Sequence, residues 1–185
     1  MTTGILTSLA GAASIAAVST LGDFIWAGWS LQHRPLYGLL HGSLLFLCIG
    51  LYLGALAKRS LTGAIGGALI GFSAAGGFYL IAPVLGRSAM FFLWFAAWIA
   101  LGFLNQRLTR REITGTIPGI NIRGAFGRGV LAAVGSGAAF YLVSGIWFPF
   151  DPEGWDYLAH FGAWMVAYLP GFAALCIERK MTQPD

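Results

Sequence analysis

Residues 36–57 read LYGLLHGSLLFLCIGLYLGALA, a run of 22 residues that contains no Asp, Glu, Lys or Arg. An α-helix needs about 20 predominantly apolar residues to cross the hydrocarbon core of a bilayer. Lys58 and Arg59 follow at once, and such charges are stable among lipid headgroups rather than in hydrocarbon. The stretch therefore predicts a transmembrane helix that ends at Ala57.

Five more apolar runs of similar length occur in the chain, and charges or turn residues separate them. Hydrophobic residues make up 57% of the 185 residues and charged residues only 10%, whereas a soluble domain carries about 25% charged residues. We therefore predict an all-α integral membrane bundle of six transmembrane helices that forms a single domain over residues 1–185. The predicted spans are 5–29, 36–57, 63–86, 88–106, 127–149 and 156–177.

The basic residues between these spans fall mainly on one side of the membrane. Arg34 and Arg87 lie on the opposite side from the termini. The residues on the side of both termini are Lys58, Arg59, Arg107, Arg110, Arg111, Arg123, Arg128, Arg179 and Lys180. Loops rich in Lys and Arg stay in the cytoplasm, so we expect cytoplasmic termini and, in a bacterial cell, a location in the inner membrane. Because the charges are divided among loops and form no single basic face, we expect no nucleic-acid partner.

An internal repeat links the third and fifth spans. Residues 67–80 read GALIGFSAAGGFYL and residues 129–142 read GVLAAVGSGAAFYL, an offset of 62. The spans that follow also correspond, because WFAAW at 94–98 matches HFGAW at 160–164. A fainter third copy opens the chain, with small residues at 11–19 before Phe24-Ile25-Trp26. The sequence thus predicts three parallel two-helix repeats, and in repeated membrane folds the repeat interface often holds the substrate.

Within each repeat, small residues give way to large aromatic residues towards the outer end. Glycine and alanine allow helix backbones to approach closely, whereas phenylalanine and tyrosine keep them apart. We therefore expect the helices to separate at that end around a central cavity that opens towards the outer leaflet. The alternative is a packed bundle in which the aromatic rings fill the same space.

Asp23 is the main polar feature inside the first five spans, about four residues from the outer end of its run. A charged side chain in hydrocarbon costs several kcal/mol unless it is paired or hydrated, so an intramembrane acid indicates a functional site. Pairing with His33 or Arg34, or interaction with the outer headgroups, is the alternative. The candidate partners at similar depth are His41, Tyr79, Tyr141, His160 and, one turn nearer the outer face, Ser144.

His41 and His160 could face each other as axial haem ligands, but single histidines on each helix favour hydrogen bonding in a polar pocket instead. Cys48 and Cys176 show neither a C-x-x-C spacing nor paired histidines, which indicates buried thiols. We therefore expect neither a cofactor nor a bound metal.

These features favour a protein that binds or senses a membrane lipid of the diacylglycerol or sterol class. Asp23, His41 and His160, with Ser144 nearby, would hold the hydroxyl or ester end of the lipid, since a few convergent polar groups fix orientation in an apolar pocket. The residues expected to line its apolar wall are Trp26, Tyr79, Trp98, Tyr141 and Trp164. Association with further copies of the chain stays open.

The alternative is a small proton-coupled transporter or a membrane enzyme that uses Asp23 with His41 or His160 for proton transfer. The chain contains no nucleophile elbow, no H-E-x-x-H and no phosphate-binding glycine loop. These absences favour binding over catalysis.

Two segments resemble the Insig family of six-span membrane proteins. His41-Gly42-Ser43-Leu44-Leu45-Phe46, with Gly50 and Leu51, is similar to the first span of that family. Phe140-Tyr141-Leu142-Val143, with Pro152 and Tyr157, is similar to the approach to its last span. The resemblance implies a sterol or a related lipid in a central cavity. The chain departs from the family because a full span precedes His41, and Asn105-Gln106-Arg107 stands where an Asp-rich signature is expected.

Overall fold

A computed structural model describes residues 2–29, 34–109, 121–147 and 153–176. Over these residues the chain forms six α-helices and one short 3₁₀ turn, and it contains no strand. All six helices are long and apolar enough to cross a membrane, which confirms the predicted all-α six-span architecture. The helices are α1 (Thr2–Gly28), α2 (Pro35–Leu56), α3 (Ser60–Leu85), α4 (Ala89–Thr109), α5 (Ile122–Trp147) and α6 (Asp156–Cys176), with the turn η1 (Gly86–Ser88) before α4.

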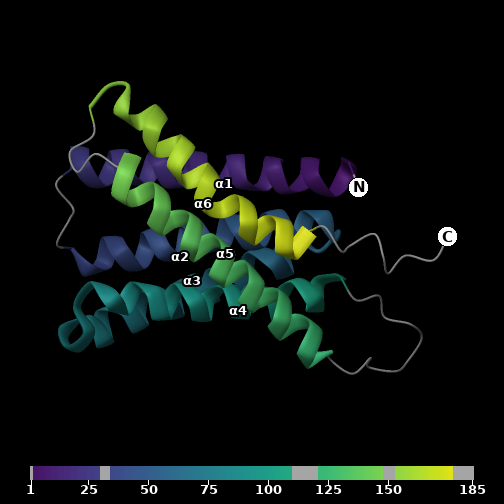
Figure 1. The fold of residues 1–185 in the computed structure, drawn as a ribbon. Helices are drawn as coiled ribbons and strands as arrows, with labels where there is room; N and C mark the ends of the chain where they lie inside the picture. Colours follow the sequence, from purple (N-terminus) through teal and green to yellow (C-terminus); the bar gives the residue numbers. More distant parts are fainter. Residues whose placement is uncertain (1, 30–33, 110–120, 148–152, 177–185) are drawn as a thin grey trace.

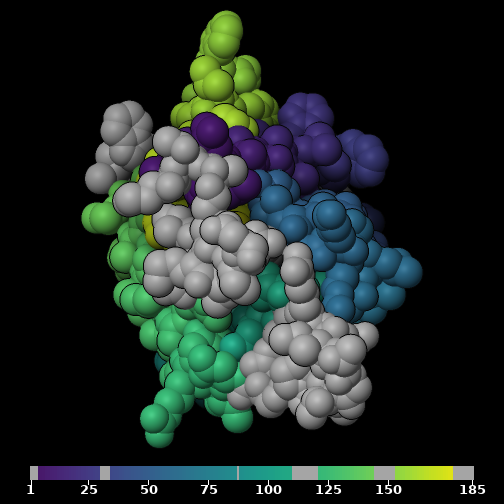
Figure 2. All heavy atoms as spheres, turned by 90° about the vertical axis from the view of Figure 1, so that its right-hand side faces the viewer, coloured from purple at the N-terminus to yellow at the C-terminus, as the bar shows by residue number. Residues whose placement is uncertain are grey.

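The helices form a closed ring in which each one packs against its neighbours in the chain and α6 packs against α1 (Figure 1). In addition, α4 contacts both α2 and α6. The start of α1 and the end of α6 lie at the same end of the bundle, which we call the inner end, and the opposite end is the outer end (Figure 1). Figure 2 looks onto the inner end, where α2 and α3 (blue) lie on the opposite side from the start of α5 (green).

The inner end also carries most of the described basic residues. Lys58 and Arg59 follow α2, Arg107 lies in the last turn of α4, and Arg123 and Arg128 lie in the first two turns of α5. The fifth span begins at Ile122 and not near residue 127, so these two arginines are helical. The three-copy repeat itself stays a prediction.

The closest helix pair is α2 and α3, and glycines on both helices make this contact. An added methyl group at Gly50 would overlap the carbonyl oxygen of Gly63, and one at Gly71 would overlap that of Gly42. Gly67 approaches the Phe46 carbonyl in the same way. Backbones this close gain dispersion contacts that lipid cannot replace, so the glycine contact holds the hairpin together.

Buried residues concentrate in the inner part of the bundle. Large side chains such as Ile49, Leu53, Leu101 and Phe172 are fully buried there. By contrast, no residue of 35–44, 72–85, 90–96 or 137–143 is buried. The interior is therefore packed towards the inner end, whereas the outer parts of α2, α3, α4 and α5 keep accessible surface.

Gly67→Ala is expected to destabilise the bundle by roughly 1–3 kcal/mol, the usual cost of overpacking, because its methyl group would overlap the Phe46 carbonyl oxygen. Gly76→Ala on the same helix is the matched control, since its methyl group would meet only Leu39 Cδ2 at 3.8 Å. Alanine also has the higher helix propensity, so the control should melt at or above the wild-type temperature. Thermal unfolding in detergent micelles checks both variants. Equal melting temperatures would contradict the close backbone contact.

Candidate functional site

The Asp23 carboxylate on α1 accepts two hydrogen bonds from α6. Trp164 Nε1 donates to Asp23 Oδ2 at 2.6 Å, and His160 Nδ1 lies 3.0 Å from the same oxygen. Because a carboxylate only accepts, the proton of the second bond is on Nδ1 of the imidazole. His160 and Trp164 are one helical turn apart, so both side chains face α1. The structure thus pairs Asp23 with one of its predicted partners, His160.

Burial differs across this pair. The His160 side chain is 3% exposed, whereas that of Asp23 is 20% exposed. Both donors bind the same carboxylate oxygen, Oδ2. Among the residues that the structure describes, no hydrogen bond involves Oδ1. The carboxylate therefore keeps one acceptor oxygen without a partner among the described residues while the other oxygen is held in place. In the described chain Arg34 makes no ion pair with Asp23, and His33 lies outside the described residues.

One helical turn further in, Ser19 Oγ and the Tyr168 hydroxyl share a hydrogen bond of 3.0 Å. Ser19 precedes Asp23 by four residues and Tyr168 follows Trp164 by four, so antiparallel α1 and α6 meet in register along one polar seam. Beyond it, Gly11 lies against the Phe172 ring. The seam therefore becomes apolar towards the inner end.

A cluster of stacked aromatic rings fills the space beside this seam. Trp164 stacks on Phe140 at a centroid distance of 5.2 Å and on Tyr168 at 5.7 Å. Trp94 stacks on Phe140 at 6.2 Å and lies 5.8 Å from Tyr168. We call the following residues the aromatic cluster: Trp94, Trp98, Phe140, Trp164, Tyr168 and Phe172. Its rings come from α4, α5 and α6 and form the floor beneath the outer part of the bundle.

His41 approaches Asp23 from α2. Its imidazole lies against the backbone of Gly22 and stacks on Tyr37 at 5.7 Å. The Tyr37 hydroxyl donates to the Gly22 carbonyl oxygen at 2.7 Å. Asp23 also interacts electrostatically with both of these rings. His41 therefore belongs to the surroundings of the carboxylate without binding it directly.

The other predicted residues lie in three different places. Trp98 is fully buried in the aromatic cluster. Tyr79 on α3 places its hydroxyl against Gly38 of α2. Trp26 is 38% exposed and Tyr141 is 65% exposed, so these two face outward from the group around Asp23. The side chain of Ser144 lies outside the described residues.

Sequence reasoning missed Ser19, Trp94, Phe140 and Tyr168. For Tyr168 a signal was present, because His160, Trp164, Tyr168 and Phe172 follow one another at intervals of four residues on one face of α6. Ser19 and Asp23 repeat the same interval on α1. Reading the two intervals together would have predicted the polar seam.

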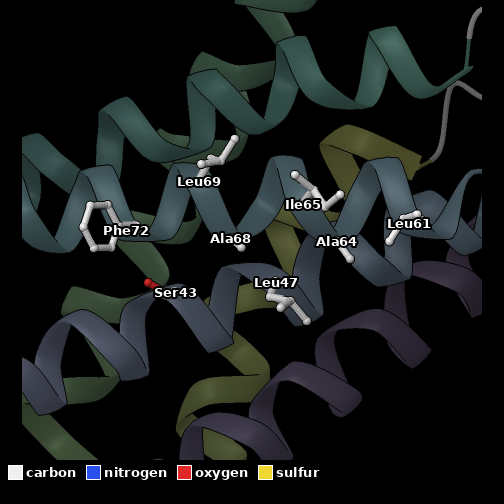
Figure 3. A pocket seen from close by; sticks show the side chains of 8 residues that line it. All are labelled: Ser43, Leu47, Leu61, Ala64, Ile65, Ala68, Leu69 and Phe72. Carbon is white, nitrogen blue, oxygen red and sulfur yellow. The ribbon is translucent and has the colours of Figure 1, made fainter.

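Two open apolar grooves flank α3, away from the residues around Asp23. The larger, of about 450 Å³, lies between α2 and α3 (Figure 3). The smaller, of about 340 Å³, lies between α3 and α4. The residues of the larger groove are Ser43, Leu47, Leu61, Ala64, Ile65, Ala68, Leu69 and Phe72. In the described part of the chain, no group of three or more His, Cys, Asp or Glu side chains could hold a metal ion.

No family model, no curated protein and no solved structure matches this chain. The resemblance to the Insig family therefore stays a prediction, and the function has to be argued from the site.

Trp164→Phe should lower the stability because it removes the N–H that binds Asp23 while keeping an aromatic ring for the stack. The loss should lie between roughly 0.6 kcal/mol, typical of hydrogen bonds within membranes, and about 3 kcal/mol, typical of bonds to charged groups. Trp155→Phe is the control, because Trp155 is 87% exposed. Thermal unfolding in micelles measures both. If the Trp164→Phe protein had the same melting temperature as this control, the hydrogen bond would contribute nothing to the stability of the fold.

Proposed function

We propose that this chain is a membrane protein that binds or senses a lipid, and that Asp23 holds the polar end of that lipid. The observation that carries the proposal is that the two oxygens of the Asp23 carboxylate differ in their hydrogen bonds. Oδ2 is held by His160 and Trp164, while Oδ1 has no partner among the described residues and the side chain is 20% exposed. A preoriented acceptor of this kind suits a hydroxyl donor.

The surroundings of Asp23 support a lipid as the ligand. Apolar walls with a few convergent polar groups are typical of small-molecule sites. Half-buried rings such as Trp94, Phe140 and Trp164 offer such a wall, and the outer parts of the neighbouring helices keep accessible surface. A lipid with a free hydroxyl and a neutral body, of the diacylglycerol or sterol class, matches one accessible acceptor beside apolar surface. His41 would contact the ligand from the side of α2.

The packing of the inner half favours binding over transport. A transporter must expose its site to both sides of the membrane in turn. Here Ile15, Ile49, Leu53, Leu101 and Phe172, all buried, separate the seam around Asp23 from the polar residues at the inner end. These side chains belong to one cluster of buried hydrophobic residues. We therefore expect a ligand to reach the site from the outer end.

A second candidate rests on the Asp23–His160 pair itself. A carboxylate bonded to an imidazole is an arrangement that can relay protons, so a proton-coupled transporter or a membrane enzyme would use these two residues. The apolar layer is the observation that ranks this candidate below lipid binding.

We further propose that the inner end with its basic residues faces the cytoplasm of a bacterial cell, because this placement satisfies the positive-inside rule. The resemblance to the Insig family agrees with a lipid-binding role, and homo-oligomers stay compatible with it.

Native mass spectrometry of the protein extracted in mild detergent, followed by lipid identification, tests the proposal. The wild type is expected to retain one lipid per chain. Asp23→Ala should lower the lipid occupancy about tenfold, the equivalent of one hydrogen bond of 1.4 kcal/mol to a charged group. Glu153→Ala, which removes an exposed acid near the same end, should bind as the wild type does. Lipid-free wild type, or unchanged occupancy in Asp23→Ala, would overturn the proposal.

Proteoliposomes loaded with a pH-sensitive dye separate the two candidates. A lipid-binding protein should leave the proton permeability at the level of empty vesicles. Proton flux that Asp23→Asn abolishes would replace lipid binding by proton coupling.

A further inference from the structure

The larger apolar groove, between α2 and α3, follows one face of α3 (Figure 3). Exposed side chains that line it on α3 recur at intervals of three or four residues, at Leu61, Ile65, Leu69 and Phe72. Ala64 and Ala68 lie among them and are half-buried. The two alanines are small, so the groove is hollowed between the larger side chains of α3 and the neighbouring helix α2.

The groove is as long as one leaflet is thick. At about 1.5 Å of rise per residue, the distance from Leu61 to Phe72 is roughly 16 Å. Half of the hydrocarbon core measures about 15 Å. Because α3 begins at Ser60 at the inner end, the groove extends from the inner boundary of the hydrocarbon to about its middle. This is the depth that one acyl chain of the inner leaflet occupies.

The lining of the groove offers almost no hydrogen-bonding group. Its one polar side chain, Ser43, already donates its hydroxyl to the Leu39 carbonyl oxygen at 2.7 Å. The other seven lining side chains are aliphatic or aromatic. A hydrocarbon chain therefore suits this groove, whereas a ligand with polar groups along its length would lose its hydrogen bonds to water there.

Two cations stand at the inner end of the groove. Lys58 and Arg59 directly precede α3, and Leu61 follows two residues later. Among the residues that the structure describes, neither cation forms an ion pair. The acids of that part of the chain, Asp23, Glu153 and Asp156, all lie towards the outer end. The positive charge at the mouth of the groove is therefore complementary to an anionic headgroup.

The smaller groove lacks this combination. Its lining on α4 ends at Ala100, about two helical turns before Arg107, and its lining on α3 begins only at Leu69. It therefore lies at mid-depth, away from the cations described at the inner end. Apolar surface and positive charge meet at the larger groove.

We propose that the groove between α2 and α3 binds an anionic phospholipid of the inner leaflet. One acyl chain lies along Ala64 and Ala68, and the headgroup phosphate meets Lys58 and Arg59. A zwitterionic phospholipid also carries a phosphate, but its ammonium group is repelled by the same two cations. The site lies at the opposite end of the bundle from Asp23, so it does not depend on the proposed function.

Native mass spectrometry of the full chain, stripped of lipid, tests the charge requirement. The probes are phosphatidylglycerol and phosphatidylcholine with identical acyl chains, and the wild type is expected to bind the first phosphatidylglycerol more tightly. Lys58→Gln/Arg59→Gln should lower this affinity by roughly tenfold or more, because two cations no longer meet the phosphate. Its affinity for phosphatidylcholine should not fall.

Arg107→Gln/Arg123→Gln is the matched control for charge. Both arginines are exposed, and they remove the same charge from the inner end at α4 and α5. The start of α5 lies on the opposite side of that end from α2 and α3 (Figure 2). The control should bind phosphatidylglycerol as the wild type does. Equal losses in the two double variants, or no loss in Lys58→Gln/Arg59→Gln, would overturn the proposal.

Ala68→Leu tests the groove itself. The larger side chain should fill the hollow and lower the affinity for phosphatidylglycerol several-fold, while the melting temperature in micelles stays at or above that of the wild type. Ala10→Leu is the control, because Ala10 is exposed and lies eight residues after the first residue of α1, as Ala68 does in α3. Equal affinities of the two variants would show that no acyl chain occupies the groove.

Asp23→Ala separates this site from the one at the outer end. The variant should bind phosphatidylglycerol as the wild type does, whatever happens to a lipid at Asp23. If Asp23→Ala lost phosphatidylglycerol while Lys58→Gln/Arg59→Gln retained it, the anionic lipid would be bound at the outer end and the proposal would be wrong.

Discussion

The hydrogen bonds between the Asp23 carboxylate and α6 hold α1 and α6 together in the outer part of this protein. A charge placed in hydrocarbon costs several kcal/mol unless polar groups surround it. Asp23 meets this requirement with His160, 137 residues away in the chain, and with Trp164 one turn further along α6. The bonds join the first helix to the last, and α1 and α6 thereby close the ring of six. The same geometry leaves the second oxygen of the carboxylate without a partner among the described residues.

Side-chain size then divides the bundle into two parts. Glycines such as Gly50 and Gly67 let α2 and α3 approach until their backbones touch, and large side chains such as Ile49 and Leu53 are fully buried in the inner part. Towards the outer end, rings such as Trp94 and Phe140 occupy the interior and remain half-buried. The bundle is therefore packed at its inner end and keeps accessible surface at its outer end. This asymmetry underlies the proposal that the protein binds a lipid and does not transport a solute.

Trp98 and Phe172 join α4 to α6 at the inner side of the aromatic cluster. Trp98 contacts Trp94 in the same cluster and the Phe172 ring below it, so its position affects both the aromatic floor and the apolar layer. Pro170 bends α6 between these two levels. The packing of Trp98 and Phe172 therefore joins the aromatic cluster to the hydrophobic core.

The sequence by itself determined the six spans, the clustering of basic charge at one end, and the need of Asp23 for a partner, because length, apolar composition and the cost of a charge in lipid are local properties. It could not decide which histidine would meet the carboxylate, or that Trp98 would be buried while Tyr141 faces outward. In a helix that is apolar all round, periodicity does not mark the inner face. Only the packing of α1 against α6, between residues distant in the chain, selected His160 and placed Tyr168 beside Ser19.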